Sequence, residues 1–253
     1  MLILLPPSEG KSSARRGTPF RWDELLFPEL NEARRAVLAG LQKASDAPDA
    51  HAVLGVGASL AGDIRRNLLL GTAPASGAHS IYSGVLYEAL GYATLTPAQK
   101  RKARSQCIVV SGLWGAIGLG DRIPAYRLSM AVDLPGIGRL TTFWKQQLAA
   151  PLTRHAGHDL VVDCRSSTYA AAWTPPPQNS AAVNVFALRG GRRTVVSHFA
   201  KHTRGELARH LLTRRGAPPA TPAALLAATQ EKWTADLTPA TARKPAQLNI
   251  LVE

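Results

Sequence analysis

Four basic side chains of this sequence each follow a short apolar run or a glycine-rich stretch. They are Lys11, Arg127, Lys201 and Arg204. Loops at the ends of buried strands commonly carry functional side chains. Ammonium and guanidinium groups bind phosphate and carboxylate oxygens, so these positions predict contact with an anionic partner.

The same segments contain side chains that acid-base or nucleophilic catalysis uses. The candidates for an enzyme that acts on a nucleobase-like, nucleotide-like or other small anionic substrate are Lys11, Tyr126, Arg127, His198 and Lys201. Tyr126 and Arg127, together with Trp114, could instead supply stacking and a phosphate contact for a nucleic acid. The structural alternative is an Arg–Asp pair with aromatic side chains in the core.

A glycine turn between two helical patterns offers a second way to hold phosphate. The stretch 52–66 predicts two short helices joined by Gly-Val-Gly, and in a helix-hairpin-helix such a turn directs backbone N–H groups toward a DNA phosphate. The residues assigned to this site are Gly55, Gly57, Arg65 and Arg66. The segment 134–138 is a closer local match, but the residues before it favour a strand, so an ordinary strand-to-helix turn is expected there.

Two histidines, His198 and His202, raise the question of a metal site. A break after the predicted strand 194–199 would spoil helical i, i+4 geometry, and no acidic or Cys ligand is adjacent. We therefore expect no metal site and no cofactor. The sequence also contains no Walker loop, dinucleotide-binding glycine pattern, zinc signature or Gly-x-Ser-x-Gly elbow.

The basic excess extends along the whole chain. Thirty Lys and Arg against seventeen Asp and Glu give a formal net charge of +13, and a field of this size speeds the capture of anionic partners. An Arg-rich composition typical of GC-rich genomes is the alternative explanation. Duplex DNA is the partner that we expect, a small anionic ligand is the second candidate, and no protein partner is inferred.

The sequence favours a cytoplasmic protein without a membrane contact. No apolar run approaches the roughly 20 residues that span a bilayer. The apolar start 1–5 is too short for a signal peptide and stops at Pro6. Cys107 and Cys164 lie in apolar stretches, which is typical of reduced, buried thiols rather than of a disulfide.

Short apolar strands and amphipathic helices should position these residues. Strands are expected at 2–5, 107–110, 126–132, 159–164, 183–188, 194–199 and 248–252. Besides the glycine-turn pair, helices are expected at 23–41, 80–92, from 96, at 140–152 and 205–212, and up to about 233. The Arg-Gly-Gly-Arg stretch at 189–192 predicts a hairpin. The length of 253 residues fits one mixed α/β domain over 1–253.

Six segments, in their order and spacing, resemble the YaaA family of peroxide stress proteins over nearly the whole chain. They are 1–11, 111–115, 124–130, Phe143-Trp144, 161–166 with Tyr169, and 197–201 with Arg204-Gly205. The resemblance implies a compact mixed α/β fold with a central mixed sheet, surrounding helices, a positively charged cleft and a helix-hairpin-helix-like element within 54–66. It also implies binding of duplex DNA and a role in limiting oxidative damage and free iron.

Two positions depart from the family pattern. Ser129 stands where many members have Glu, and His202 stands where a second Lys is usual. Loss of that Glu weakens the case for acid-base chemistry in the cleft. The function that we expect is peroxide-stress protection by holding duplex DNA in a basic cleft. The alternatives are an enzyme that uses the same cleft, and an iron- or haem-handling protein that uses His198 or His202.

Overall fold

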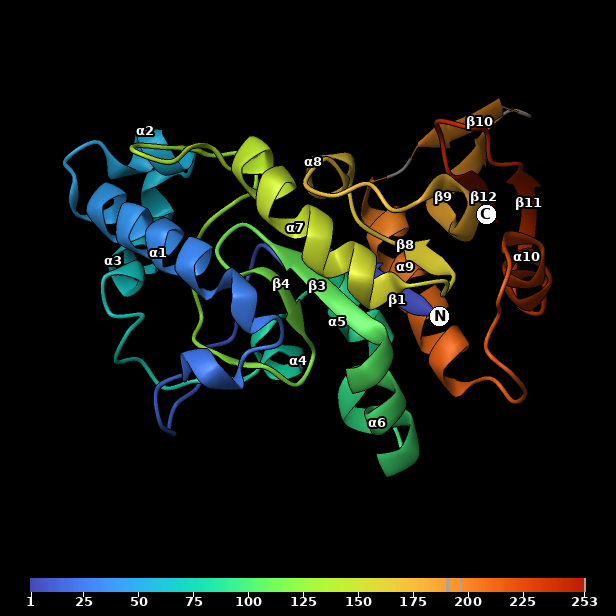
Figure 1. Ribbon diagram of the computed structural model, residues 1–253, viewed down its shortest axis with the longest axis horizontal. Helices are drawn as coiled ribbons and strands as arrows, with labels where there is room; N and C mark the ends of the chain where they lie inside the picture. Colours follow the sequence, from blue (N-terminus) through green and yellow to red (C-terminus); the bar gives the residue numbers. More distant parts are fainter. Residues whose placement is uncertain (190–191, 196, 253) are drawn as a thin grey trace.

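An eight-stranded mixed sheet runs through the molecule (Figure 1). The computed structural model describes residues 1–189, 192–195 and 197–252. The strand order is β11-β12-β9-β8-β1-β3-β4, and β10 also pairs with β9. The strands are β1 (Leu2–Leu5), β3 (Cys107–Ser111), β4 (Gly115–Gly118), β8 (Val161–Asp163), β9 (Ser180–Arg189), β10 (Arg192–Val195), β11 (Thr234–Thr238) and β12 (Ala246–Val252).

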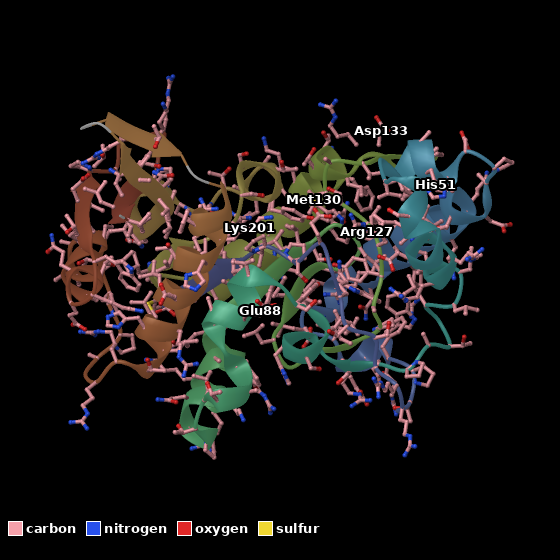
Figure 2. All side chains as sticks on the ribbon, turned by 180° about the vertical axis from the view of Figure 1, so that it is seen from behind. His51, Glu88, Arg127, Met130, Asp133 and Lys201 are labelled. Carbon is pink, nitrogen blue, oxygen red and sulfur yellow. The ribbon has the colours of Figure 1, made fainter. Side chains whose placement is uncertain are left out.

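Helices cover both faces of this sheet. Helix α7 crosses one face, and α5 and α9 lie on the other (Figures 1 and 2). Helices α1 to α3 form one end of the molecule, and α10 lies at the opposite end beside β11 (Figure 1). The α-helices are α1 (Asn31–Asp46), α2 (Ala50–Leu54), α3 (Ala61–Asn67), α4 (Ala78–Ile81), α5 (Val85–Leu90), α6 (Pro97–Gln106), α7 (Leu140–Ala156), α8 (Ser167–Ala170), α9 (Ser197–Thr213) and α10 (Pro222–Gln230).

Shorter elements complete the description. Two small antiparallel ribbons pair β2 (Ser76–Gly77) with β5 (Arg122–Ile123) and β6 (Asp133–Leu134) with β7 (Gly138–Arg139). The 3₁₀ turns are η1 (Trp22–Glu24), η2 (Pro28–Leu30), η3 (Ala58–Leu60), η4 (Tyr92–Thr94) and η5 (Pro177–Asn179). No helix in the described ranges is both long and apolar enough to cross a bilayer.

The central strand β1 determines where a site can form. All four of its residues are buried, as expected for a strand covered on both faces. It pairs in parallel with β3 on one side and with β8 on the other. The chain leaves β1 toward β3, whereas it leaves β8 toward β9. Because these two connections diverge at neighbouring strand ends, a crevice opens there, which is the usual ligand position in such sheets.

The predicted fold class is confirmed, and so are several of the predicted elements. The chain has mixed α/β structure around a central mixed sheet. The strands predicted at 2–5, 107–110 and 159–164 correspond to β1, β3 and β8. The glycine turn at 55–57 does join helical segments, α2 before it and η3 with α3 after it. The segment 134–138 forms the small β6–β7 ribbon before α7, so it is not a helix-hairpin-helix.

The helix predicted at 23–41 begins eight residues later, at Asn31. Phe27 adopts a left-handed backbone (φ 61°), which interrupts any helix across this point. The fully buried Arg34 holds that irregular segment in place, since its guanidinium donates to the carbonyls of Leu26 (2.7 Å) and Phe27 (3.1 Å). It also donates to two carbonyls of the β3–β4 hairpin, at Trp114 and Ala116.

The strand predicted at 126–132 is absent. The side chain of Asn67 makes the backbone hydrogen bonds that a neighbouring strand would otherwise make to Arg127. Arg127 N–H donates to Asn67 Oδ1 (2.8 Å), and Asn67 Nδ2 donates to the Arg127 carbonyl (3.0 Å). Asn67, the last residue of α3, is fully buried. The backbone of Arg127 is therefore satisfied outside any sheet.

The helix predicted at 80–92 is split into α4 and α5, and the break receives the loop that follows β1. Gly84 (φ 92°) lies in the break. The backbone of Lys11 forms an isolated antiparallel bridge with Tyr82, and Ser83 N–H donates to Ser8 Oγ (3.1 Å). These contacts fix the loop 6–11 against α4 and α5.

The strand predicted at 194–199 ends at Val195, and α9 begins at Ser197. Lys201 and Arg204 therefore lie on a helix and not in a loop behind a strand. The predicted pairing of two strands around 189–192 is present as β9 and β10, while the turn residues 190–191 lie outside the described residues.

Candidate functional site

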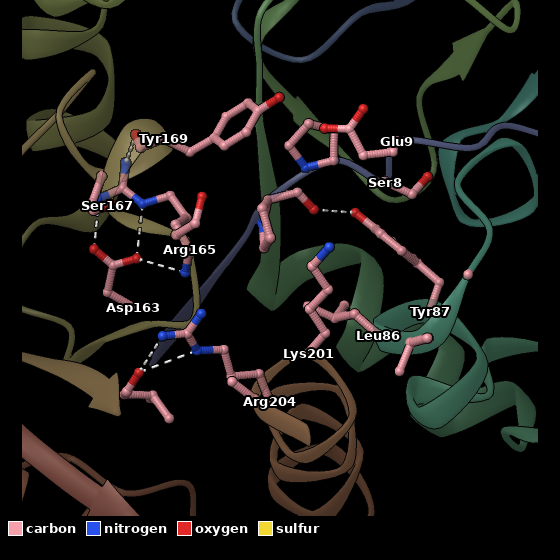
Figure 3. A pocket seen from close by; sticks show the side chains of 18 of the residues that line it. Ser8, Glu9, Leu86, Tyr87, Asp163, Arg165, Ser167, Tyr169, Lys201 and Arg204 are labelled. Carbon is pink, nitrogen blue, oxygen red and sulfur yellow. Dashed lines mark hydrogen bonds and ion pairs between the residues drawn. The ribbon is translucent and has the colours of Figure 1, made fainter. Parts of the chain in front are cut away.

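A cavity of about 870 Å³ occupies the crevice at the ends of β1 and β8 (Figure 3). Its walls come from five segments: the loop 6–10 behind β1, residues 83–87 at the start of α5, residues 163–170 behind β8, residues 182–184 of β9, and α9. A volume of this size is in the range of pockets that hold small organic molecules. The cavity is the leading candidate for a functional site among the described residues.

Helix α9 supplies the cations of this cavity. Arg204 Nε and Nη2 both donate to the Val183 carbonyl (3.1 and 2.8 Å), which fixes the guanidinium against β9. Lys201, one turn earlier, is exposed, and its ammonium points into the cavity in Figure 3. No described residue accepts a hydrogen bond from the Lys201 ammonium or from Arg204 Nη1.

A glycine allows α9 to approach α5 closely enough to form this wall. A Cβ on Gly205 would lie 2.1 Å from the Leu86 carbonyl oxygen and 2.9 Å from the Ala89 Cβ. Any larger residue there would push α9, and with it Lys201 and Arg204, away from α5.

The segment behind β8 is held by a buried ion pair. Arg165 forms a bidentate pair with Asp163 (2.8 and 2.7 Å) and also donates to the carbonyls of Tyr169 and Trp173. Arg165 is 4% exposed. Its charge is neutralised by Asp163 and its donors are occupied, so its role is to fix the loop 163–173 rather than to bind a ligand.

The loop 6–11 separates the cavity from a second cluster of polar residues. Glu9 lines the cavity, and its carboxylate pairs with Arg127 (2.8 Å) on the outer side. Arg127 is 18% exposed. Tyr169 also lines the cavity and accepts a long hydrogen bond from the Met130 N–H (3.5 Å). Ser129, which stands where many YaaA-like sequences have Glu, therefore lies next to the site.

Lys11 belongs to this second cluster and does not line the cavity. Its ammonium donates to the Ser8 carbonyl (2.8 Å) and lies 4.2 Å from the ring centre of Tyr126. Burial lowers the pKa of Lys11 to about 7, and Glu9 offsets part of that effect. The pKa of Lys11 is thus depressed toward neutral pH.

Tyr126 is a buried phenol with fixed partners. Ser111 Oγ accepts hydrogen bonds from the N–H groups of Leu113 and Trp114, and its hydroxyl also hydrogen-bonds the Tyr126 hydroxyl (2.6 Å). The Tyr82 hydroxyl lies 3.0 Å away on the other side. Burial raises the pKa of Tyr126 well above its usual value, so the phenol stays neutral. Tyr126 is 2% exposed.

Trp114 and Tyr126 do not form a stacking surface for a nucleic acid, because both side chains lie in the core. Trp114 is completely buried and packs edge-on against Phe20 and Tyr126, with ring centres 5.0 and 6.2 Å apart. Neither ring can stack on a base of a bound nucleic acid without unfolding this region. The structural alternative for these aromatic residues is the correct one.

The glycine turn lies apart from the cavity. Gly55 is left-handed (φ 64°), and its own N–H donates to the Ala52 carbonyl (3.2 Å). Gly57 and Arg65 are exposed, and Arg66 pairs with Asp63 (2.9 Å). The turn is joined to the second cluster through Asn67 and Arg127.

The geometric argument against a histidine pair was also wrong. Because α9 begins at Ser197, His198 and His202 are four residues apart on one helix. The side chain of His198 lies outside the described residues. His202 is 51% exposed and its Nδ1 lies 3.4 Å from Glu206. In the described part of the chain, no three His, Cys, Asp or Glu side chains gather as a metal site would require.

The structure thus divides the predicted site residues into three groups. Lys201 and Arg204 face the cavity. Lys11, Tyr126 and Arg127 form the second cluster, which does not line the cavity. Gly55, Gly57, Arg65 and Arg66 lie around the glycine turn. The linking residues Glu9 and Asn67 were missed by the sequence analysis. Glu9 could have been found because it lies in the same short loop as Lys11, whereas Asn67 carries no local signal.

Comparison with known proteins places the chain among peroxide stress proteins. Residues 1–237 match the sequence model of a family described as "Peroxide stress protein YaaA". A UPF0246 protein of Streptomyces coelicolor is 45% identical over 258 residues, which is 100% of this chain and 98% of that protein. UPF0246 proteins of Corynebacterium efficiens and Corynebacterium glutamicum are 42% and 40% identical, over 84% and 83% of this chain and 85% and 84% of their own lengths.

Proposed function

The chain belongs to the YaaA family of peroxide stress proteins, and from that premise we propose that it limits oxidative damage by binding duplex DNA on the face that carries Arg127 and Lys201. The position of Arg127 carries the proposal. Asn67 of α3 fixes its backbone, and Glu9 pairs with its guanidinium from the loop that also borders the cavity of Lys201 and Arg204. Cations from two distant parts of the chain, Arg127 and the α9 pair, therefore lie around one loop.

The order of these groups fits an elongated polyanion. In Figure 2, Arg127 lies between Lys201 and His51, which is on α2 directly before the glycine turn. A duplex lying along this face would meet Lys201, Arg127 and the glycine turn in succession. Duplex DNA presents one negative charge per roughly 1.7 Å of its axis, so a row of cations can neutralise several phosphates.

Phosphates would replace carboxylates that these cations now contact. Glu9, the partner of Arg127, is 63% exposed, and Arg66 pairs with Asp63 at the surface of α3. A surface ion pair contributes about 0–1 kcal/mol, so exchange of Asp63 for a phosphate at Arg66 costs little. The N–H groups that begin the helical segment after Gly57 lack helical acceptors and suit a phosphate oxygen.

The test is a titration of fluorescent duplex DNA, read by anisotropy at about 50 and about 200 mM salt. We expect affinity to fall steeply with salt and to weaken in Arg127→Ala, Lys201→Ala and Arg66→Ala. The matched control is Lys145→Ala, which removes an exposed charge from α7 on the other face. Absence of binding, or equal losses in the control and the three variants, would contradict the proposal.

A further inference from the structure

We propose that the cavity beside α9 binds one nucleotide unit, with its phosphate on Lys201 and Arg204 and its base against the apolar residues of the loop after β1 and of α5. A duplex is too wide to enter a cavity of about 870 Å³, whereas a single nucleotide fits into it. The site is therefore additional to the duplex-binding face and does not rest on it.

The charges around the cavity match a phosphate. Besides the cations of α9, four charged side chains lie at or beside the cavity, and they form two ion pairs. Arg165 pairs with Asp163, and Arg127 pairs with Glu9 of the loop after β1. Lys201 and Arg204 remain as two positive charges without a carboxylate partner among the described residues. A phosphomonoester carries close to two negative charges at neutral pH.

Arg204 is oriented before any ligand arrives. Its Nε and Nη2 are fixed on the Val183 carbonyl, which leaves Nη1 as the end of the guanidinium available to a ligand. An oriented donor loses little side-chain entropy on binding. Lys201 adds a mobile charge one turn away, so the pair can hold two oxygens of one phosphate.

The remaining walls suit a sugar and a base. The apolar wall consists of Pro6, Pro7, Val85 and Leu86, against which a flat ring can pack. Ser167 supplies a hydroxyl for sugar hydroxyls or ring nitrogens, and Asn184, whose amide N–H groups already donate to Gln247 and Asn249, supplies its carbonyl oxygen. Ser8 and Glu9 also line the cavity, where they contact Ser83 and Arg127. In Figure 3, Glu9 and Ser8 lie on the side of the cavity away from Arg204. A nucleotide whose phosphate contacts Arg204 could therefore direct its base toward Ser8 and Glu9.

Calorimetric titration tests the ligand class directly. The probes are adenosine and uridine monophosphates, with adenosine, ribose 5-phosphate and inorganic phosphate as comparisons. We expect a monophosphate to bind about 10-fold or more tightly than the nucleoside, as expected for loss of charge-assisted hydrogen bonds. A 5′-phosphorylated single strand, titrated in parallel, distinguishes a free nucleotide from the end of a nucleic acid.

Two variants assign the binding to this cavity. Lys201→Ala should weaken monophosphate binding about 10-fold or more, and Lys201→Arg should restore most of it. Lys145→Ala should have no effect. Ala170→Phe places a ring in the cavity and should abolish nucleotide binding while duplex affinity stays unchanged.

Arg66 lies on α3 and does not line the cavity, so Arg66→Ala should have the opposite effects to Ala170→Phe. It should weaken duplex binding and leave nucleotide binding intact, so a failure of one proposal is distinguishable from a failure of the other. Equal binding of nucleoside and monophosphate, no binding of any phosphate probe, or unchanged nucleotide affinity in both Lys201→Ala and Ala170→Phe would overturn the assignment.

Discussion

The side-chain amide of Asn67 hydrogen-bonds both backbone groups of Arg127, at 2.8 Å to its N–H and 3.0 Å to its carbonyl. The amide thus takes the place of a neighbouring strand for this residue. Because Asn67 is the last residue of α3, the glycine-turn region and the loop around Arg127 are joined by one buried side chain.

Asn67→Ala should therefore affect both stability and binding. It leaves two part-buried backbone groups of Arg127 without their protein partner, and each such loss costs up to about 1–3 kcal/mol. We expect urea unfolding to show a loss of about 2–4 kcal/mol, and the duplex affinity to approach that of Arg127→Ala. Full stability in Asn67→Ala would show that water replaces the amide without cost.

The second prediction concerns Lys11 and pH. Its folded pKa of about 7 lies below its usual value of 10.5, so between these values the unfolded chain binds more protons than the folded one. The contribution of Lys11 to stability is full above 10.5 and is lost as the pH falls through 7. The free energy of unfolding, relative to that of Lys11→Met, should rise with pH across this window.

Amine labelling offers an independent measurement of the same group. The reactivity of Lys11 toward an amine reagent, followed by mass spectrometry, should reach half its maximum near pH 7, because burial depresses its pKa. Lys145, an exposed lysine, serves as the internal reference. A parallel pH profile for both lysines would contradict the depressed pKa.

Gly205→Ala should destabilise the protein through the contact of α9 with α5. The added methyl group would overlap the Leu86 carbonyl, and forced overpacking of this kind costs about 1–3 kcal/mol. Gly62→Ala is the matched control, since a Cβ there meets nothing within 4 Å in α3, and it should be neutral or stabilising by up to about 1 kcal/mol. Thermal unfolding of both variants measures the difference.

The two cysteines should not react in the folded protein. Both are unpaired and buried, and burial raises the pKa of Cys107 above its usual value and that of Cys164 to about 12. Thiolate is the species that peroxide and disulfide reagents attack. We expect a colorimetric thiol assay to detect neither cysteine until denaturant is added. Rapid reaction of the native protein would point instead to a thiol-based peroxide response.

The sequence was sufficient to predict the parts of the fold that local patterns encode. Buried strands such as β1 and β3 are unbroken apolar runs, and the glycines at 55 and 57 mark the turn between α2 and the helical segment that leads to α3. The start of α9 was missed because Thr194 and Val195 continue a β-branched run almost to the first helical residue.

Long-range side-chain contacts explain the other errors. The extended pattern at 126–132 has no strand beside it, since Asn67, 60 residues away in sequence, satisfies Arg127. For Trp114 and Tyr126 the sequence left both a stacking role and a place in the core open, and the chain packs them inside the β3–β4 region. Lys201 and Arg204 could be selected from the sequence as candidate cations, but the cavity that they face depends on sheet topology, which no local pattern encodes.

The single carboxylate of Glu9 has one side on the cavity and its partner Arg127 on the other side of the loop. A ligand that draws this carboxylate inward releases a positive charge outside, and an anion that takes Arg127 releases Glu9 to the cavity. By thermodynamic linkage, the two effects are equal in free energy. Glu9 is thus a carboxylate shared by two surfaces, and a ligand that contacts it would compete with Arg127 for it.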